Sequence, residues 1–522
     1  MNKIKTIIAI TVLLGGFVIG ISGQSQPASA ISGQQWEIQA NFTDEFEGSE
    51  IDWQNKWSKT SSLPNVSAWK WDNTNNATLN DGVVELTMRH NANNVSDGGT
   101  FFKSGIIQSQ TKTCYGYFEA RIKGSSIPET SNPSTYKYDW YGRGCCPAFW
   151  LWGFDESQPI HSGKAVRYSE IDVVEIQQFD YYQNKQYRIK DLDLNLHTIV
   201  DGNWVRPKND PENQKSHFEM SEDPTAGYHT YGVENRPDSI FWYLDGERVA
   251  AKKNRYWHLD MNVTVSLGIR VPFVKFQNNA WAVVNPLNDA RAKAKLDALY
   301  DETVNPDAAG TTKMHLDYIR TWKAMPSLWF DVENSYDNSE NLEANIGFQP
   351  GTGYSLSSEM QCHLLEKDES GNVIKTLVTV KDQNVIGLYG GNSKISMPIS
   401  NVTPSSELPG NHYYVLQATF TNSNGEAIAA TSDVITINGT STNVDHISSF
   451  PYEVYPNPAT DMLYIKGKAN RSEPCNISIY QITGQLVLHN NQCNAVNISG
   501  LAAGMYIIKV NGKTSRFIKN QL

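Results

Sequence analysis

The chain has no excess of positive charge. Among its 522 residues, 44 are Lys or Arg and 55 are Asp or Glu, which gives a formal net charge of −11. Nucleic acids and anionic membranes attract proteins with clustered positive charge, so this balance excludes nonspecific binding to nucleic acid or to a membrane surface. A polyanionic ligand would need a locally basic cleft on an otherwise acidic protein.

Long hydrophobic runs are also missing, except at the N-terminus. There Lys3 and Lys5 precede an apolar run over residues 7–21, which is followed by Ala28-Ser29-Ala30. A basic start, a short apolar stretch and small residues are typical of a secretory signal peptide, which we place at residues 1–30. No later segment approaches the roughly 20 apolar residues that a membrane-spanning helix needs, so no membrane span is expected after cleavage.

Cysteine is scarce, and the spacing of the six cysteines matches no common zinc motif. Because such motifs need closely spaced pairs of Cys or His, we predict no metal site of this kind. Export permits disulfides, although the sequence alone does not fix their connectivity. The pairings to be tested join Cys475 with Cys493, and Cys114 with either Cys145 or Cys146.

Alternation of apolar and polar residues predicts an all-β protein, and its first unit spans residues 31–325. Strand-like stretches such as 82–88 and 115–122 are separated by turn residues, which is typical of an antiparallel sandwich. One helix is expected near 289–300, where Ala, Leu and Lys dominate.

Two smaller β units follow. Residues 327–440 contain short strands divided by Gly, Asn and Ser, and predict an immunoglobulin-like sandwich. We expect this unit to be a spacer, with carbohydrate binding as the alternative. A polar linker over 438–443 then leads to a small β-sandwich at 450–522.

Three carboxylates lie within six positions of residues 169–175, in a stretch that otherwise favours a strand. In a regular strand Glu170 and Asp172 share one face, and Glu175 points to the other. One extra residue between Asp172 and Glu175, a β-bulge, would turn Glu175 back to the first face and return Ile176 to the core. The two Glu Cα atoms would then lie roughly 13 Å apart, and their carboxyls would reach the ~5 Å separation of a retaining glycoside hydrolase.

The alternative is that these acids form a solvated strand face. Solvated strands usually mix Lys, Thr and Ser among the acids, because crowded like charges repel each other. Clustered carboxylates are better explained by chemistry that needs two protonation states. One carboxylate stays ionised as a nucleophile, while its neighbours keep another protonated as an acid.

Other strands predict which side chains face these acids. In residues 192–197 every second residue is Leu, which leaves Asp193, Asn195 and His197 on the opposite face. Such polar positions are typical of a concave sheet that binds sugar, and a sheet that only faces solvent is the alternative.

Aromatic and basic residues are predicted to complete the groove. Trp150 and Trp152 flank Leu151 and share a face, and one of them is a candidate sugar platform, with core packing as the alternative. Alternation along 261–270 places Arg270 in the groove, and Trp204 and Arg206 lie two positions apart and share a direction. A set of guanidinium groups is suited to sulfate, because each forms paired hydrogen bonds to an oxyanion.

Residues 170–175 match the Glu-x-Asp-x-x-Glu motif of glycoside hydrolase family 16, and the surrounding segments resemble the κ-carrageenases of that family. The similarity covers most of residues 40–325. The longer segments that carry it are SEIDVVEIQQFD at 169–180, DLDLNLH at 191–197, YWH at 256–258, MNVT at 261–264 and RVPFVKF at 270–276.

The resemblance implies a β-jelly-roll sandwich with a cleft. It also implies an endo-acting, retaining hydrolase that cleaves β-1,4 linkages in a sulfated red-algal galactan, with κ-carrageenan as the expected substrate. On the matching positions, Glu170 would be the nucleophile and Glu175 the acid/base, with Asp172 between them. The substrate path would be lined by Trp150, Trp204, Arg206 and Arg270, with Arg270 near a sulfate and His197 beside the catalytic strand.

One departure from the resemblance is a long polar segment, residues 125–144, which is expected to border the cleft and to alter the choice of galactan. The alternatives within the family are therefore a furcellaranase, a β-agarase or a porphyranase. The alternative from another class is a lectin-like protein that binds polysaccharide without cutting it, which the acid triplet argues against.

The family implies no catalytic cofactor, and members often carry a structural calcium ion far from the cleft. We expect a monomer. At the other end, Tyr455-Pro456-Asn457-Pro458 with the stretches 504–510 and 516–519 resembles the C-terminal sorting domain of type IX secretion cargo. This resemblance implies the type IX machinery as a partner and a secreted or cell-surface location.

Overall fold

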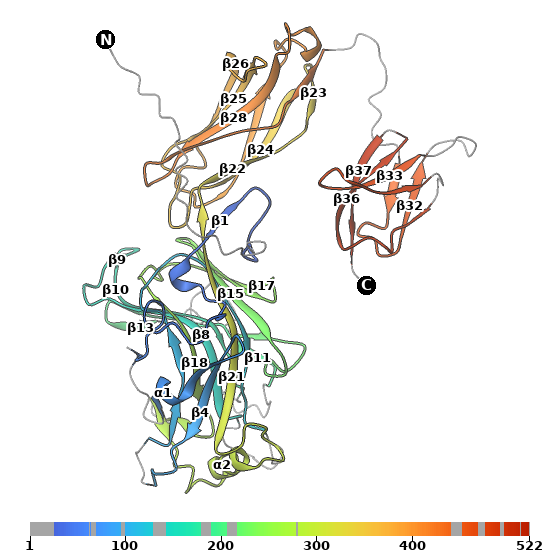
Figure 1. Cartoon of the computed structure of the whole chain (residues 1–522). Coiled ribbons are helices and arrows are strands. Elements are labelled where there is room, and N and C mark those ends of the chain that lie inside the picture. Colours follow the sequence, from blue (N-terminus) through green and yellow to red (C-terminus); the bar gives the residue numbers. More distant parts are fainter. Residues whose placement is uncertain are drawn as a thin grey trace. The chain divides into compact units, whose positions relative to one another are not determined.

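A computed structural model describes residues 26–61, 63, 69–95, 100–128, 142–178, 189–205, 217–277, 280–439, 452–467, 476–490, 495–511 and 513–520 (Figure 1). The chain forms two compact units, Met1–Gly439 and Thr440–Leu522. The apolar run of the expected signal peptide, residues 7–21, lies outside the described residues.

Two large antiparallel sheets face each other in the N-terminal part of the first unit (Figure 1). The back sheet has the order β17-β16-β15-β7-β21-β4-β5-β2, with β1 paired to β21 and β3 to β4; only the β2–β5 pair is parallel. Its strands are β1 Gln35–Ile38, β2 Trp69–Trp71, β3 Ala77–Asn80, β4 Val83–His90, β5 Phe102–Ser104, β7 Gly116–Lys123, β15 His229–Asn235, β16 Ser239–Leu244, β17 Glu247–Lys253 and β21 Thr311–Met325.

The front sheet has the order β13-β12-β10-β8-β18-β6, and short strands β9, β11 and β14 extend it around β10. Its strands are β6 Ile106–Gln108, β8 Cys145–Phe154, β9 Ile160–His161, β10 Lys164–Glu175, β11 Asp191–Asp193, β12 Leu196–Val200, β13 Asn203–Val205, β14 His217–Glu219 and β18 Asn262–Ile269. A separate hairpin joins β19 Val274–Gln277 to β20 Ala280–Val283.

The core between these sheets is formed by alternate side chains of their central strands. Leu86 of β4, Phe118 of β7, Phe149 of β8 and Val265 of β18 are each fully buried in one continuous cluster. Alternation of this kind buries one face of every strand and leaves the other for solvent or ligand. The all-β prediction with a large sandwich is therefore confirmed.

Helices are few in the described residues. The predicted helix is α2, Ala290–Tyr300, whose N-cap Asp289 accepts hydrogen bonds from the backbone N–H groups of Arg291 and Ala292. The other described helices are α1 Asn73–Asn76 and the 3₁₀ turns η1 Ala40–Phe42 and η4 Ser405–Glu407.

Residues 327–439 form small sheets around a core of their own. The sheet orders are β22-β24-β27, β26-β25-β28-β29 and the parallel pair β23-β30. The strands are β22 Ser327–Val332, β23 Ser335–Asp337, β24 Asn341–Gln349, β25 Met360–Lys367, β26 Val373–Asp382, β27 Gly391–Pro398, β28 Tyr413–Thr421, β29 Ala427–Thr431 and β30 Thr436–Asn438.

The second unit is also a small β structure with its own core, which includes Leu463, Ile479 and Ile508. Its sheets have the orders β31-β32-β35 and β34-β33-β36-β37. The strands are β31 Tyr452–Tyr455, β32 Met462–Gly467, β33 Ile477–Gln481, β34 Leu486–Asn490, β35 Ala495–Asn497, β36 Gly504–Val510 and β37 Lys513–Lys519. The suggested partners Cys475 and Cys493 lie outside the described residues.

Candidate active site

Strand β10 contains the predicted β-bulge. Asp172 lies opposite Trp150 of β8, and the next pair along the ladder is Val174 with Phe149, so Val173 is an extra residue. The additional residue shifts the later part of the strand by one position. The predicted bulge is thereby confirmed.

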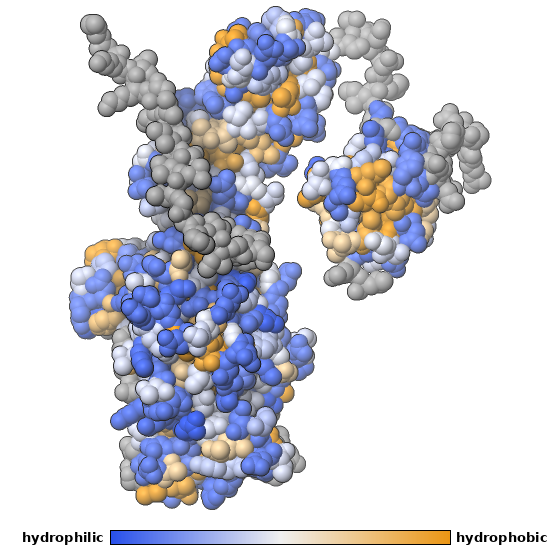
Figure 2. Space-filling view, viewed as in Figure 1, coloured by the Kyte–Doolittle hydropathy of each residue, from blue (hydrophilic) through white to orange (hydrophobic). Residues whose placement is uncertain are grey.

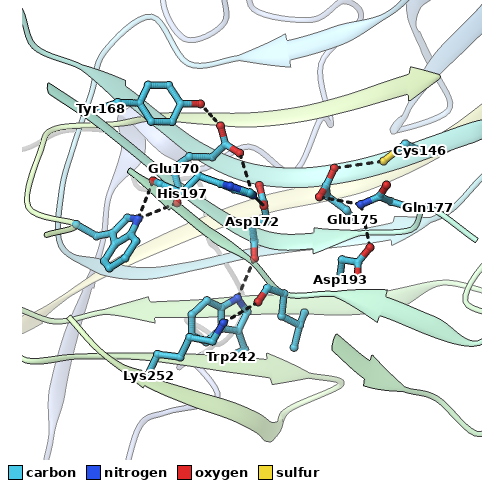
Figure 3. A network of polar contacts seen from close by, with 12 residues as sticks. Cys146, Tyr168, Glu170, Asp172, Glu175, Gln177, Asp193, His197, Trp242 and Lys252 are labelled. Carbon is cyan, nitrogen blue, oxygen red and sulfur yellow. Dashed lines mark hydrogen bonds and ion pairs between the residues drawn. The ribbon is translucent and has the colours of Figure 1, made fainter. Parts of the chain in front are cut away.

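The bulge brings the three carboxylates to one face. Glu170, Asp172 and Glu175 all line the same cleft, whereas Ile176 is 1% exposed and lies in the core. In Figure 3 the three acids follow one another along β10, and all are turned to the same side of the front sheet. An unbulged strand would have turned Glu175 toward the interior of the sandwich.

The cleft has a volume of about 260 Å³, and half of its lining residues are aromatic or acidic. Trp150 and Trp152 project from β8 on either side of the buried Leu151. Trp150 is held by a hydrogen bond of 3.1 Å from its Nε1 to Ser266 Oγ. The remaining lining residues are Leu63, Trp69, Trp71, Cys146, Ala148, Tyr168, Gly268, Ile269, Arg270 and Val274.

Asp172, which is buried, and Glu170, which is partly exposed, form an acidic pair at one end of the triplet. The Tyr168 hydroxyl donates to Glu170 Oε2. His197 Nε2 lies 3.2 Å from Asp172 Oδ2 and 3.7 Å from Glu170 Oε1 (Figure 3). His197 reaches this position because its residue on β12 pairs directly with Glu170.

Burial dominates the protonation of this pair. Desolvation, followed by the charge of Asp172, raises the pKa of Glu170 to about 8. Desolvation and the charges of Glu175 and Asp193 raise the pKa of Asp172 well above its usual range. The pair therefore holds a proton at neutral pH, which two separate carboxylates in water would not do.

Glu175 is held by a different set of partners. Arg270 Nη2 donates to Glu175 Oε1 at 2.6 Å, and Arg270 Nε donates to Gln177 Oε1 at 3.0 Å. The Gln177 amide donates in turn to Glu175 Oε2 at 3.1 Å and to Asp193 Oδ2 at 2.8 Å. Cys146 Sγ adds a contact of 3.6 Å to Glu175 Oε1 (Figure 3). These contacts fix the position of the Glu175 carboxyl from three directions.

Two acids that differ in environment, placed on one face of an aromatic cleft, are suited to hydrolysis of a glycosidic bond. Residues 36–324 match the family model described as beta-porphyranase A-D, GH16 domain. The chain belongs to glycoside hydrolase family 16. The matched range contains almost all of both large sheets and the strand β10 that bears the three acids.

Relatives of this family 16 chain include kappa-carrageenases. It is 33% identical over 313 residues to the kappa-carrageenase of Pseudoalteromonas carrageenovora, an alignment that covers 57% of this chain and 67% of the relative. It is 27% identical over 239 residues to beta-agarase AgaB34 of Agarivorans albus, covering 42% and 43% of the two chains. A crystal structure of a kappa-carrageenase from Zobellia galactanivorans is 44% identical, with a TM-score of 0.49, covering 57% of this chain and 99% of that one.

The C-terminal residues 453–522 match a secretion system C-terminal sorting domain. The predicted sorting domain is therefore confirmed, and this family 16 enzyme is a secretion cargo. In the described part of the chain, no helix combines the length and apolar character that crossing a bilayer requires.

The other predicted site residues of this family 16 enzyme have different outcomes. Trp204 is 50% exposed, and its ring lies 5.2 Å from that of Tyr168 and 5.8 Å from that of His197. It therefore extends the aromatic surface beside the acidic pair. Arg270 lines the cleft but contacts Glu175 directly, which sequence patterns did not predict. Arg206 and most of the polar segment 125–144 lie outside the described residues.

Several residues of this site were missed. Trp69 and Trp71, two apart on β2, line the cleft, and their spacing was a usable signal. Gln177 and Cys146 lie beyond or at the end of a strand, where alternation no longer predicts direction. From the back sheet, Trp242 bonds Asp172 O of β10 and Lys252 bonds Leu194 O between β11 and β12. No pattern within one strand predicts contacts across a sandwich.

The expected pairing of Cys114 with Cys145 or Cys146 is wrong, because all three are free and buried. Cys114 follows Thr113, which bridges to Met261 directly before β18, whereas Cys145 lies opposite Ile269 at the end of β18. The intervening strand separates these positions by about 26 Å at ~3.3 Å per residue. A disulfide requires Cα atoms within about 7 Å.

Hydrolases of this family need no cofactor. Within the described ranges, the one group of three acidic, His or Cys side chains close enough to hold a metal ion is Glu170, Asp172 and His197, whose ligand atoms lie within 4.8 Å. This group lies in the cleft, so it does not match a structural calcium ion remote from the cleft. The calcium expectation has no such side-chain group to support it in the described residues.

Proposed function

We propose that this enzyme cleaves β-1,4 linkages within κ-carrageenan, as an endo-acting hydrolase that retains anomeric configuration. The observation that carries the proposal is the bulged strand that places Glu170, Asp172 and Glu175 on one face of an aromatic cleft. The choice of polymer is supported by the 33% identity to a kappa-carrageenase, which spans 67% of that relative.

Glu170 is the proposed nucleophile. Asp172, which shares a proton with it, has the more deeply buried side chain, 4% exposed against 18% for Glu170. Glu170 reacts in its ionised form, which the Tyr168 hydroxyl stabilises by donating a hydrogen bond to it. Its carboxylate attacks the anomeric carbon, the bond to the leaving oxygen breaks, and a covalent glycosyl ester forms.

Glu175 is the proposed acid/base. It gives its proton to the leaving oxygen in the first step, and in the second step it takes a proton from the water that hydrolyses the ester. Arg270, Gln177 and Cys146 hold its carboxyl at the required place. Burial raises the pKa of the Cys146 thiol, so the thiol stays protonated and acts as a donor.

The activity test uses κ-carrageenan, furcellaran, agar and porphyran, with new reducing ends as the readout. We expect release from κ-carrageenan above the other three, with the β-anomer formed first in proton NMR of fresh products. Glu170→Gln is expected to lower kcat by at least about 10⁴-fold while polymer binding remains. The matched control is Glu156→Gln, which removes an exposed acid paired with Arg167. Undiminished turnover by Glu170→Gln would exclude Glu170 as the nucleophile.

A sulfate role for Arg270 is part of the proposal, and its contact with Glu175 changes the expected result. Arg270→Lys is expected to lower kcat on every galactan, because the paired contacts to Glu175 and Gln177 are lost. A further loss is expected only on sulfated polymers. The ratio of kcat/KM on κ-carrageenan to that on agar measures this further loss, and an unchanged ratio contradicts sulfate recognition.

Porphyranase activity is the second candidate, because the matching family model is described as the GH16 domain of beta-porphyranases. Release of reducing ends from porphyran above those from κ-carrageenan would favour it. Binding to these polymers without any new reducing ends would instead support the lectin-like alternative.

A further inference from the structure

The ladder beside the acid triplet is interrupted on both strands. Ile171 of β10 pairs with Leu196, and the next pair on that side is Glu175 with Asp193. Three residues of β10 lie between these pairs. Only two residues, Leu194 and Asn195, lie between them on the neighbouring segment that joins β11 to β12. Here Asp172 N–H donates to Asn195 O at 2.9 Å, outside the regular ladder. The bulge that orients Glu175 thus depends on irregular backbone.

Two side chains of the back sheet bond to backbone carbonyls at this interruption. Trp242 Nε1, on β16, donates to Asp172 O at 2.9 Å. Lys252 Nζ, on β17, donates to Leu194 O at 3.2 Å (Figure 3). Both side chains are buried, and the Lys252 ammonium lies 5.4 Å from the centre of the Trp242 ring. Buried carbonyls in irregular backbone need such partners, because water is excluded there.

The use of a lysine at this position is costly. Trp242 shows that a neutral donor is sufficient to bond a carbonyl here, whereas an ammonium must also lose its hydration. Desolvation lowers the pKa of Lys252 to about 8, and the charge of Asp172 opposes that shift. A charged group buried behind a cluster of acids gains energy from those acids, and it stabilises their ionised forms in return.

We propose that Lys252 is a positioning residue for the acid triplet, fixing the interrupted ladder from the far sheet and placing a positive charge behind Asp172. The proposal rests on the proposed role of the triplet in hydrolysis. The titratable and charged groups that act on Asp172 in the described structure are Glu170 and Glu175 of β10, Asp193 of β11, His197 of β12, Arg270 after β18 and Lys252 of β17.

Removal of the charge has a predictable sign. A carboxylate loses stabilisation when a nearby cation is removed, so the pKa values of Glu170 and Asp172 rise further. Because the nucleophile must be ionised, the ascending limb of the pH profile of kcat/KM moves to higher pH. The difference in kcat/KM between the wild type and a variant without this charge is largest below pH 8. It becomes smaller above pH 8, where Lys252 itself becomes neutral.

The test compares Lys252→Met, which removes both charge and donor, with Lys252→Gln, which keeps a donor, and Lys252→Arg, which keeps both. We expect Lys252→Met to lower kcat by about tenfold or more with KM within about twofold. We expect Lys252→Met and Lys252→Gln to move the ascending limb of the pH profile to higher pH, and Lys252→Arg to keep it at the wild-type pH. The matched control is Lys56→Met, which removes an ammonium that bonds Thr43 O at 2.7 Å.

Wild-type kcat and pH profile in Lys252→Gln and Lys252→Met would overturn the proposal, as would a shift of equal size in Lys56→Met. If Lys252→Met does not fold, Lys252→Gln gives the result. If the wild type cuts no galactan, the proposed function fails, and the unfolding temperatures of wild type and Lys252→Gln are then compared. A buried lysine with a lowered pKa destabilises the fold at pH 6 and does so less at pH 9. The unfolding temperature of the wild type must therefore rise relative to that of Lys252→Gln between pH 6 and pH 9. If the wild type shows no such relative increase in unfolding temperature, the proposal that Lys252 places a positive charge behind Asp172 is overturned.

Discussion

The protonation of the site is decided by pairs of side chains. Glu170 and Asp172 share one environment, and both have raised pKa values. Glu175 lies five positions after Glu170 but contacts Arg270, Gln177 and Cys146 instead. Three acids of similar intrinsic strength thus receive different partners within one strand.

Asp172→Asn tests the coupling between Asp172 and Glu170. Asp172 is the second cause, after burial, of the raised pKa of Glu170, so removing its charge lowers that pKa. We expect the ascending limb of kcat/KM against pH to move to lower pH, opposite to the shift expected for Lys252→Met. We also expect kcat to fall by about 10²-fold, because the amide cannot hold the shared proton.

The measurement is the full pH profile from pH 4 to 9 on the preferred galactan. Glu156→Gln serves as the control for loss of one negative charge at the surface, since its partner Arg167 is also exposed. An ascending limb that stays in place in Asp172→Asn would show that Asp172 does not set the protonation of Glu170.

At the scale of elements, β10 decides which face each acid occupies. A shift of one residue moves every following side chain to the other face of a strand. With the extra Val173, the strand holds all three acids in the cleft; without it, the strand would bury Glu175 in the core. The energetic risk of that second arrangement is large, because an unpaired buried carboxylate is strongly destabilising.

Deletion of Val173 is the direct test of this arrangement. The shortened strand must either place Glu175 in the core or break its pairing with β8, so we expect loss of activity by at least about 10⁴-fold. Val173→Ala is the matched control: it keeps the bulge and removes only buried methyl groups, with an expected stability loss of about 1–3 kcal/mol. Activity assays and thermal unfolding of both variants give the result. An active deletion variant would mean that the bulge does not orient Glu175.

Alternation along single strands predicted much of this site. It placed Glu170, Asp172 and His197 on one face, and the one-residue bulge was predicted from the need to bring Glu175 back. Contacts between elements far apart in sequence were not predictable in this way. Arg270 was expected to face sulfate, but its bond to Glu175 depends on how β18 and β10 end relative to each other. The cysteine pairing failed for the same reason, because the spacing of Cys114 and Cys145 gives no information about register along β18.

At the scale of the whole molecule, catalysis and export are assigned to separate units. The family 16 match ends at residue 324 and the sorting match begins at residue 453. The second unit has its own core and leaves large apolar side chains exposed, including Tyr455, Tyr464 and Met505. Figure 2 shows a hydrophobic cluster on the visible face of this unit, whereas the visible face of the first unit is mainly hydrophilic. Exposed apolar patches of this kind are typical of binding surfaces.

Truncation after Gly439 tests whether hydrolysis and export depend on different units. The cleft and its core lie in Met1–Gly439, so we expect kcat, KM and unfolding temperature of the purified truncated enzyme to stay within about twofold and a few degrees of the full chain. In cells with a type IX system, we expect the truncated enzyme to accumulate inside, because the matched sorting domain is missing. Activity in the medium, on the cell surface and in the periplasm gives the distribution of the enzyme.

A full-length variant that carries Glu170→Gln is the control, since it must be exported normally without turnover. Export of the truncated chain would place the sorting information in the first unit, and loss of its activity would show that the cleft depends on the second.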